Sequence, residues 1–289
     1  GYRRKKALKP AVRRKLVNYA QSAHSISLRR ACRVVGISDS VYRYQPDPIG
    51  DVAVIAGLQQ AVEKYPAYGF SKLFKILRRW GHRWNHKRVH RIYCRLNLNK
   101  RRRGKKRLPN RSPIALALPA TINGCWSLDF MCDSLFCGRR FRTLNIVDDF
   151  SREALAIEID VGLSAERVQR ILDRVVAWRG YPSKLRMDNG PEFISTTLAD
   201  WAEEHTVELE FIQPGKPTQN SYIERFNRTY RDEVLNMYVF KTLSEVRLIT
   251  EEWMDQYNEE RPHDALGDLT PFQYRWAHQT QEYSNLDCP

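Results

Sequence analysis

Three carboxylate residues in the second half of the chain could act together on one bond. Asp129 lies within the extended run WSLDFM, although aspartate is depleted in strands. Asp188 ends the extended run KLRMD at the start of a turn, and Glu224 lies on the polar face of an amphipathic helix that follows the loop GKPTQN. Each position also has an ordinary explanation, because edge strands, Asx turns and solvated helix faces are common.

A shared location would give these carboxylates a common task. A central meander strand and the following crossover strand are adjacent in a mixed sheet, so Asp129 and Asp188 are expected at one spot, with Glu224 brought across it by its helix. Three ionised carboxylates within ~4 Å of one another repel by about 4 kcal/mol per pair at an effective dielectric of ~20, so the cluster needs cations. Oxygen ligands without thiolate or imidazole select Mg²⁺ or Mn²⁺, and two such ions can hold the attacking and leaving oxygens of a phosphodiester.

Other kinds of site have weaker support. His82, His86, His90 and Cys94 are spaced four apart, but side chains along one stripe of a helix do not surround a zinc ion, and the sequence has no Cys-x-x-Cys pair. Contact with DNA or packing is the favoured interpretation of these residues. No Gly-x-Ser-x-Gly turn and no glycine-rich phosphate loop are present.

The elements that must position the carboxylates begin near residue 125. Extended runs joined by short polar turns predict an antiparallel meander at 125–135, 139–151 and 154–161. Helices and strands then alternate at 164–179, 184–188, 195–205 and 207–212. This order predicts an α/β fold with a mixed sheet and helices on both faces. The apolar stripe of the helix that carries Glu224 is expected to contain Ile223, Phe226, Tyr230, Val234 and Met237.

The first part of the chain is expected to be helical and is strongly basic. Residues 1–111 hold 30 Lys and Arg against 4 Asp and Glu, whereas residues 112–289 hold 18 against 29, within a net charge of +15. Two helix-turn-helix outlines are predicted, at 1–48 and at 49–98. In the first, Ala31, Val34 and Val35 are expected to face inward. This charge asymmetry indicates a basic DNA-binding part joined to an acidic domain.

The residues expected to contact DNA lie in three places. The last helix of the second outline, capped by Asn85, offers His86, Lys87, Arg88 and Arg91. The basic linker at 99–124 offers phosphate contacts from Arg101, Arg102, Arg103, Lys105 and Lys106. The residues expected to meet phosphates around Glu224 are Lys216, Asn220, Arg225 and Arg228.

The sequence gives no indication of a membrane partner. It contains no run of 18 apolar residues and no arrangement typical of a secretory signal, so a cytoplasmic protein is expected. Its six cysteines are scattered, which suits reduced thiols.

The combined motifs resemble those of transposases of the insertion-sequence-three family, whose catalytic core is similar to retroviral integrase. Asp129, Asp188 and Glu224 match the family's DDE triad, with 35 residues between the last two. The runs MDNGPEF, QPGKPTQNSYIERFN and YNEERPHDALGDLTP match three blocks of the core, and YGFSKLFKILRRWGHRWNHKRVHRIY matches the upstream helix-turn-helix. The likeness spans about residues 50–277, without the His-His-Cys-Cys zinc domain of the retroviral enzymes.

This resemblance implies an RNase-H-like core at 125–237 and a C-terminal helical extension at 238–289. It implies that the three carboxylates bind two Mg²⁺ or Mn²⁺ ions and catalyse DNA cleavage and strand transfer. The family's upstream zipper segment has no counterpart in this chain, which resembles the downstream-frame portion of such proteins.

The implied partners follow from the same resemblance. They are double-stranded DNA, first the terminal inverted repeats of a bacterial insertion sequence and then target DNA, and further copies of the chain in a homodimer or larger assembly at the nucleoid. A catalytically silent DNA-binding regulator and a structure-specific nuclease on the same fold are the alternatives.

Overall fold

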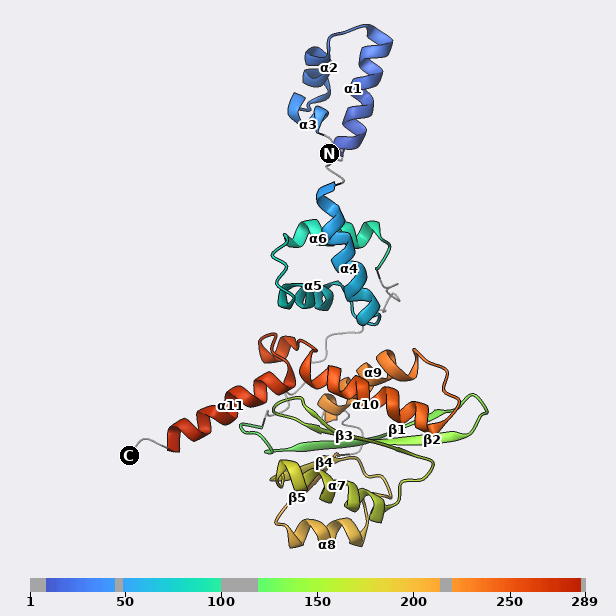
Figure 1. The fold of residues 1–289 in the computed structure, drawn as a ribbon, viewed down its shortest axis with the longest axis vertical. Helices are drawn as coiled ribbons and strands as arrows, with labels where there is room; N and C mark the ends of the chain where they lie inside the picture. The colour runs from blue at the N-terminus through green and yellow to red at the C-terminus, as the bar shows by residue number, and fades with distance from the viewer. Residues whose placement is uncertain (1–8, 45–48, 100–118, 214–219, 287–289) are drawn as a thin grey trace, which may run out of the picture. The chain divides into compact units, whose positions relative to one another are not determined.

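The computed structural model describes residues 9–44, 49–99, 119–213 and 220–286 (Figure 1). The chain divides into two compact units, residues 1–57 and residues 58–289. Among the helices in the described ranges, none combines the length and the apolar character that crossing a bilayer requires.

The first unit is a small helical module. Its helices are α1 (Pro10–His24), α2 (Leu28–Val35) and α3 (Asp39–Arg43), packed around Val17, Ala31, Cys32 and Ile37. Gly36 ends α2 with φ of 71°, a conformation that favours glycine, so the predicted turn is confirmed. The expectation for Val34 is wrong, since its side chain is 73 % exposed. Ala31 and Cys32 complete the inward face of α2, and Val34 falls on its outer flank.

The predicted helix-turn-helix at 49–98 is present as three helices: α4 (Val52–Lys64), α5 (Phe70–Arg79) and α6 (His86–Arg95). Asn85 caps α6 as expected, because its Oδ1 accepts a hydrogen bond from the backbone N–H of Lys87 at 2.9 Å. Val89, Ile92 and Tyr93 form the buried stripe of α6, which leaves its basic residues on the other side.

A five-stranded mixed sheet forms the centre of the second unit. Its strands are β1 (Trp126–Ser134), β2 (Arg140–Asp148), β3 (Ala154–Asp160), β4 (Lys184–Met187) and β5 (Glu208–Phe211), in the order β3-β2-β1-β4-β5. The first three strands are antiparallel, whereas β4 pairs with β1 and β5 in parallel. The predicted meander and α/β fold are confirmed.

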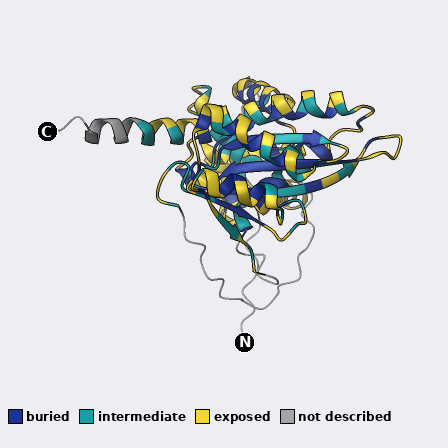
Figure 2. Cartoon of the chain, turned by 90° about the horizontal axis from the view of Figure 1, so that it is seen from below, coloured by how far each residue is buried: buried dark blue, intermediate teal, exposed yellow. Residues whose placement is uncertain are grey.

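Helices cover both faces of the sheet (Figure 1). One face packs against α7 (Ala165–Arg179) and α8 (Thr196–Glu204), and the other against α9 (Ser221–Tyr230) and α10 (Leu243–Glu259). The strands between these layers are mostly buried (Figure 2). Along β1, Trp126 and Leu128 belong to the α7 side and Met131 to the α9 side. Because side chains alternate along a strand, this pattern puts Asp129 on the α9 side.

The apolar stripe of α9 differs from its predicted form at its end. Ile223, Phe226, Tyr230 and Val234 are buried, but Met237 is 42 % exposed. After α9 the chain forms a π-helical turn at Arg231–Leu235, and this wider turn shifts the following side chains so that Leu235 is buried. The same core continues into α10, beyond the boundary expected at residue 237.

A buried hydrogen bond fixes α9 against α10. Tyr230 Oη and Thr250 Oγ1 are 2.7 Å apart, and both residues are buried. We expect Tyr230→Phe to lower the free energy of unfolding by about 1–2 kcal/mol, because it leaves the hydroxyl of Thr250 buried without its partner. Urea unfolding of Tyr230→Phe, Thr250→Val and the double variant checks this. The double variant should lose less free energy of unfolding than the sum of the losses in the two single variants. Additive losses would contradict the coupling.

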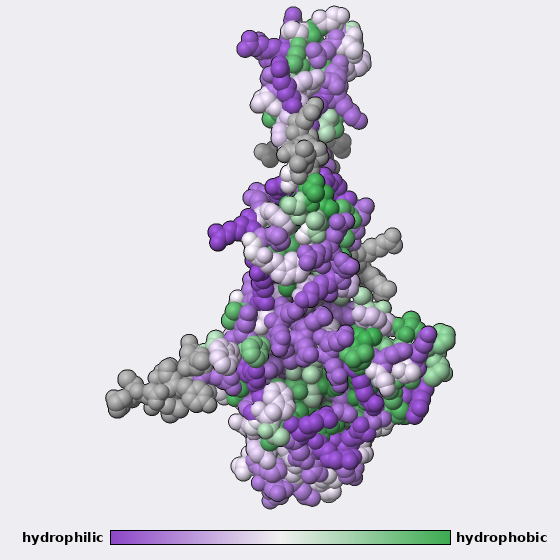
Figure 3. Space-filling view, in the orientation of Figure 1, coloured by the Kyte–Doolittle hydropathy of each residue, from purple (hydrophilic) through white to green (hydrophobic). Residues whose placement is uncertain are grey.

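The helix-turn-helix module contacts a loop that follows α10. Lys75 forms ion pairs with Asp264 and Asp268, and Arg79 Nη1 donates to the carbonyl of Glu260 at 3.1 Å. Arg79 Nη2 also donates to the carbonyl of Asp268 at 2.6 Å. Figure 3 shows mainly hydrophilic residues (purple) in this region. The contact surface between α5 and residues 260–268, which we call the α5 dock, is therefore polar.

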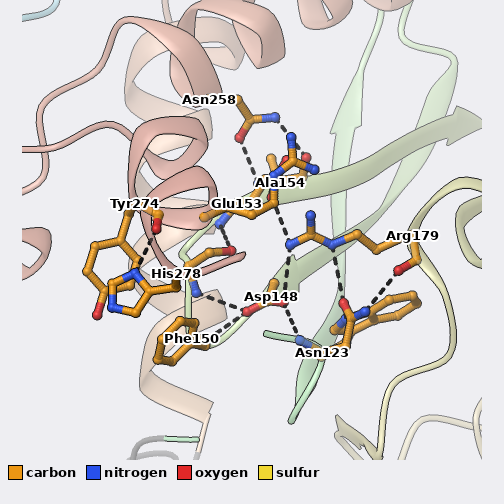
Figure 4. Close-up of polar contacts among 12 residues, drawn as sticks. Asn123, Asp148, Phe150, Glu153, Ala154, Arg179, Asn258, Tyr274 and His278 are labelled. Carbon is orange, nitrogen blue, oxygen red and sulfur yellow. Dashed lines mark hydrogen bonds and ion pairs between the residues drawn. The ribbon is translucent and has the colours of Figure 1, made fainter. Parts of the chain in front are cut away.

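A buried ionic cluster ties the end of α7 to the β2–β3 turn (Figure 4). Arg179 Nη2 lies 2.8 Å from Glu153 Oε2 and 3.5 Å from Asp148 Oδ2. Arg275, from the helix α11 (Pro271–Leu286), lies 3.4 Å from Glu153 Oε1. Asn123 donates its backbone N–H to Asp148 Oδ2 and its side-chain amide to the carbonyl of Arg179, each at 2.9 Å. No pattern in the sequence indicates this cluster.

Candidate active site

Asp129 is a half-buried carboxylate in the middle of β1, facing α9. Its Oδ1 accepts the backbone N–H of Phe130 at 2.8 Å, and its Oδ2 accepts the side-chain amide of Asn227 at 2.7 Å. The strand therefore fixes one oxygen and the helix the other.

Asp188 follows β4 directly, on the strand next to β1. The parallel pairing joins Ser127 to Arg186, and both Asp129 and Asp188 lie two residues farther along. Because side chains repeat every second residue, both carboxylates lie on the same face of the sheet. The structure thus brings these two predicted residues to neighbouring positions on one face of the sheet, with Asp129 within β1 and Asp188 just after β4.

Side-chain contacts anchor the loop that follows Asp188. The backbone N–H of Gly190 donates to Asp188 Oδ1 at 3.1 Å, and a Cβ at Gly190 would lie only 3.0 Å from that oxygen. Phe193 is buried and stacks on Phe130, with ring centroids 4.8 Å apart. Glu192 forms an ion pair with Arg142 of β2. Asp188 therefore begins a turn, as predicted, and these contacts hold that turn against β1 and β2.

Glu224 comes from α9, which lies on β1 and β2. Ile223 and Phe226 face the core, whereas Glu224 is exposed on the flank of the helix. Its charge is the smallest of the contributions that raise the pKa of Asp129, after burial and the charge of Asp188.

A pair of asparagines joins α9 to the sheet beside these carboxylates. Asn145 Nδ2 of β2 donates a hydrogen bond to Asn227 Oδ1 at 2.6 Å, and Asn227 Nδ2 donates one to Asp129 Oδ2. Asn145 is also the cross-strand partner of Asp129. The sequence alone predicts no role for either amide. Its one signal is the position of Asn227 three residues after Glu224, whereas the complete burial of Asn145 is visible only in the structure.

The carboxyl group of Asp129 has a perturbed acidity. Burial raises its pKa most, and the charges of Asp188 and Glu224 raise it further, whereas the hydrogen bonds from Phe130 and Asn227 lower it. The resulting pKa is about 6. The contributions of Asp188 and Glu224, though smaller than that of burial, show that the neighbouring charges include negative ones.

The donor chemistry of this region suits hard divalent cations. Asp129, Asp188 and Glu224 supply carboxylate oxygens, with no thiolate or imidazole near them in their described contacts. Among the described residues, no three His, Cys, Asp or Glu side chains are close enough to surround one ion. The three residues therefore suit such ions in kind, with Asp129 half-buried and both Asp188 and Glu224 exposed.

The residues expected to contact DNA have different settings. Arg225 and Arg228 are exposed on α9, but Asn220 is buried at the start of that helix. On α6, His86, Lys87 and Arg91 are exposed and Arg88 is partly exposed. The remaining predictions, Lys216 and the linker residues Arg101, Arg102, Arg103, Lys105 and Lys106, lie outside the described residues.

The histidines and cysteines have ordinary surroundings in the described part of the chain. His82 stacks on Trp84, and His86 and His90 meet Phe70 edge to face. The described cysteines, Cys32, Cys94, Cys125, Cys132 and Cys137, are free thiols.

Three family models match the chain. Residues 53–106 match an HTH-like domain, and residues 120–217 and 205–271 match two models that each describe an integrase core domain. The matched segments include α5, α6, the sheet and α9.

Similar full-length proteins come from bacterial insertion elements. The 31.7-kDa protein of insertion element IS407 from Burkholderia multivorans is 44 % identical over 88 % of this chain and 92 % of its own length. The 39.2-kDa protein of insertion element IS476 from Xanthomonas euvesicatoria is 37 % identical over 99 % of this chain and 83 % of its own. InsK, described as a transposase for insertion sequence element IS150 of Escherichia coli (strain K12), is 23 % identical over 72 % of this chain and 77 % of its own.

Proposed function

The chain belongs to the insertion-element transposases that carry an integrase core, and we propose that Asp129, Asp188 and Glu224 form its catalytic triad. Such enzymes are polynucleotidyl transferases that cut and join DNA strands. The proposal therefore concerns which residues of this chain perform an activity that belongs to the family.

One observation carries this assignment. Asp129 and Asp188 occupy matching positions on adjacent strands, and the helix laid over that face carries Glu224, whose charge helps to raise the pKa of Asp129. We take this arrangement to mean that carboxylates from three separate chain segments serve one site.

The family's chemistry depends on metal ions, and we propose that two Mg²⁺ or Mn²⁺ ions bind here. When bound, the ions would supply Lewis-acid polarisation of the phosphodiester and acidify the attacking water or 3′-hydroxyl. The oxygens of Asp129, Asp188 and Glu224 would hold them. The charges of Asp188 and Glu224, which raise the pKa of Asp129 in addition to burial, support this choice because neighbouring negative charges also favour a cation.

The protein's own contribution is to orient these oxygens. Asn227 and the N–H of Phe130 each hold one oxygen of Asp129, so the carboxyl plane is fixed before any ligand binds. The contact between Phe193 and Phe130 holds the loop after Asp188 in place. Such preorganisation limits the rearrangement that the reaction requires.

The expected substrates are the two ends of the insertion element and then a target duplex. The HTH-like match supports DNA binding, and we propose that α6 reads the terminal repeats while the core contacts phosphates. Joining requires two ends in one complex, so we propose a dimer or larger assembly on DNA. We place this activity in the bacterial cytoplasm, at the nucleoid.

The test is to incubate the whole chain with Mn²⁺ and end sequences of its element. Nicked products together with strands joined to a second DNA are expected. Cleavage without joining would instead identify a structure-specific nuclease, and binding without either product would identify a silent regulator.

Asn227 should act as a positioning residue for Asp129. We expect Asn227→Ala to raise the Mn²⁺ concentration needed for half-maximal cleavage by roughly 10- to 100-fold, as is typical when a partner of a metal ligand is removed. A titration of activity against Mn²⁺ measures this shift. A lower rate at saturating Mn²⁺ with an unchanged metal requirement would contradict it and indicate a structural role only.

Base reading by α6 gives a separate expectation. The double variant Lys87→Gln, Arg91→Gln should bind an end sequence about 10- to 100-fold more weakly, and should lose protection of that end in a footprint. Arg170→Gln, an exposed change on α7, serves as the control. Full protection by the double variant would assign recognition to another part of the chain.

A further inference from the structure

A basic hollow lies beside α9, outside the candidate triad. Its volume is about 170 Å³, and it is formed by the β2–β3 turn, α9 and the loop that contains His263. Four cationic side chains line it: Lys72, Arg152, Arg225 and Arg261. Asp264 is the acidic residue among the described lining residues, and it is already paired with Lys75. Arg261 is in turn paired with Glu233, so the excess of positive charge in the hollow comes from Lys72, Arg152 and Arg225, and it favours an anion.

Two polar atoms in this hollow lack partners. Arg152 Nη1 and His263 Nε2 are buried and make no hydrogen bond within the described residues. Buried donors without partners are costly, so such atoms call for an explanation. Burial and then the charges of Arg261, Lys72 and Arg152 lower the pKa of His263 to about 3, which keeps its imidazole neutral. A neutral ring can still donate one hydrogen bond to an anionic oxygen.

Arg152 is held in a fixed position for this contact. Its guanidinium carbon lies 3.5 Å from the centre of the Tyr222 ring, so the side chain stacks on α9. Its backbone has φ of 62°, a conformation that is rare for a residue with a side chain and that recurs at functional sites. A fixed planar fork of N–H groups suits phosphate oxygens.

The position of the hollow on α9 relates it to the triad. Tyr222, Arg225, Phe226 and Thr229 share the face of α9 that lines the hollow. Glu224 lies about 200° around the helix from Tyr222, on the opposite flank. The outer surface between the two flanks carries the exposed Arg225 and Arg228. The hollow and Glu224 are thus separated by about the width of a helix, ~10 Å, so they can contact different phosphates of one strand.

A larger and less basic hollow continues from this one toward the helix-turn-helix. Its volume is about 610 Å³, and it shares Lys72, Arg225 and Arg261 with the first. It extends to His90 of α6, and Asp232 and Glu233 are among its lining residues. The excess positive charge is thus concentrated at the end that contains Arg152.

We propose that this hollow binds one backbone phosphate of the DNA strand, away from the bond held at the triad, through Arg152 and His263. The proposal rests on the proposed function, because it takes DNA as the ligand that lies across α9. It adds a contact whose purpose is to fix the strand's position along the site. Free inorganic phosphate shares the same chemistry and is separated from DNA by the experiment.

The experiment measures binding without divalent cations, so that no strand is cut and the result does not depend on the triad. A fluorescein-labelled duplex of arbitrary sequence is titrated with the full chain at several NaCl concentrations. Arg152→Gln should weaken binding about tenfold and reduce the slope of log K against log [NaCl] by about 0.9, the value for one lost phosphate contact. Arg152→Lys keeps the charge and should restore the slope, and Arg170→Gln on the other face of the sheet should leave it unchanged.

Two results would overturn the proposal. One is a wild-type slope in Arg152→Gln with a wild-type melting temperature. The other concerns free phosphate: the melting temperature of the chain is higher in sodium phosphate than in NaCl of equal ionic strength, and Arg152→Gln loses this rise. If that variant keeps the wild-type slope of log K against log [NaCl] for DNA, the hollow binds a free anion. If Arg152→Gln has a lowered melting temperature, His263→Gln is tested in its place. Wild-type affinity of His263→Gln for the duplex would also reject the phosphate contact.

Discussion

Asp129→Ala, Asp188→Ala and Glu224→Ala should each lower the rates of DNA cleavage and strand joining by about 10³-fold or more, while DNA binding stays near that of the unchanged chain. Each substitution removes an oxygen ligand from the proposed ions, and the loss corresponds to roughly 4 kcal/mol in the barrier. Product formation with Mn²⁺ on labelled element ends measures the rate, and a gel shift without metal measures binding.

A matched control comes from the same strand. Asp133 is also on β1, but it pairs with Arg231 at 3.5 Å instead of joining the triad region. Asp133→Ala should therefore retain activity within a few-fold. Near-normal joining by Glu224→Ala would remove α9 from the proposed site, and equal losses in Asp133→Ala would attribute the effects to folding.

Arg179→Met should lower the free energy of unfolding by about 3–5 kcal/mol. The substitution leaves Glu153 and Asp148 buried without their main counter-charge, and removing one partner of a buried ion pair is far more costly than removing a surface one. Urea unfolding measures the change. Arg174→Met is the control, because Arg174 is on the same helix and pairs with Glu158 while its side chain is 63 % exposed. It should cost ~1 kcal/mol or less.

The acid dependence of Arg179→Met gives an independent check. Burial raises the pKa of Glu153, and Arg179 and Arg275 lower it, so loss of Arg179 should raise that pKa further. A carboxyl group with a raised pKa in the fold binds its proton more tightly folded than unfolded, and stability falls as pH rises through that interval. The penalty of Arg179→Met should therefore shrink as the pH is lowered from neutrality. A penalty that does not change with pH would mean that packing, and not the buried charge, is responsible.

Much of the fold follows from local patterns in the sequence. The meander and the alternating helices are regular in period, and Asn85 is a typical cap, so the predicted positions agree with the structure to within three residues. Val34 and Met237 were assigned wrongly because helical periodicity alone gives neither the exact inward direction of a short helix nor the shift caused by a π-helical turn.

The candidate site divides along similar lines. Asp129, Asp188 and Glu224 were singled out because carboxylates in these elements need a reason, and their catalytic role stays a prediction. The sequence gives no comparable reason to single out Asn145, Asn227 or Arg152, because their significance depends on contacts between segments far apart in the chain. Buried amides and a cation stacked across two elements have no signature in sequence spacing.

The α5 dock has a consequence for where the enzyme would cut. Lys75 and Arg79 hold the helix-turn-helix against residues 260–268, and those residues belong to the same unit as the triad. If α6 binds the terminal repeat, the dock sets a fixed number of base pairs between the recognised sequence and the severed bond. The protein would then act as a molecular ruler. An insertion of bases between the two DNA sites would shift the position of the cut relative to the recognised sequence.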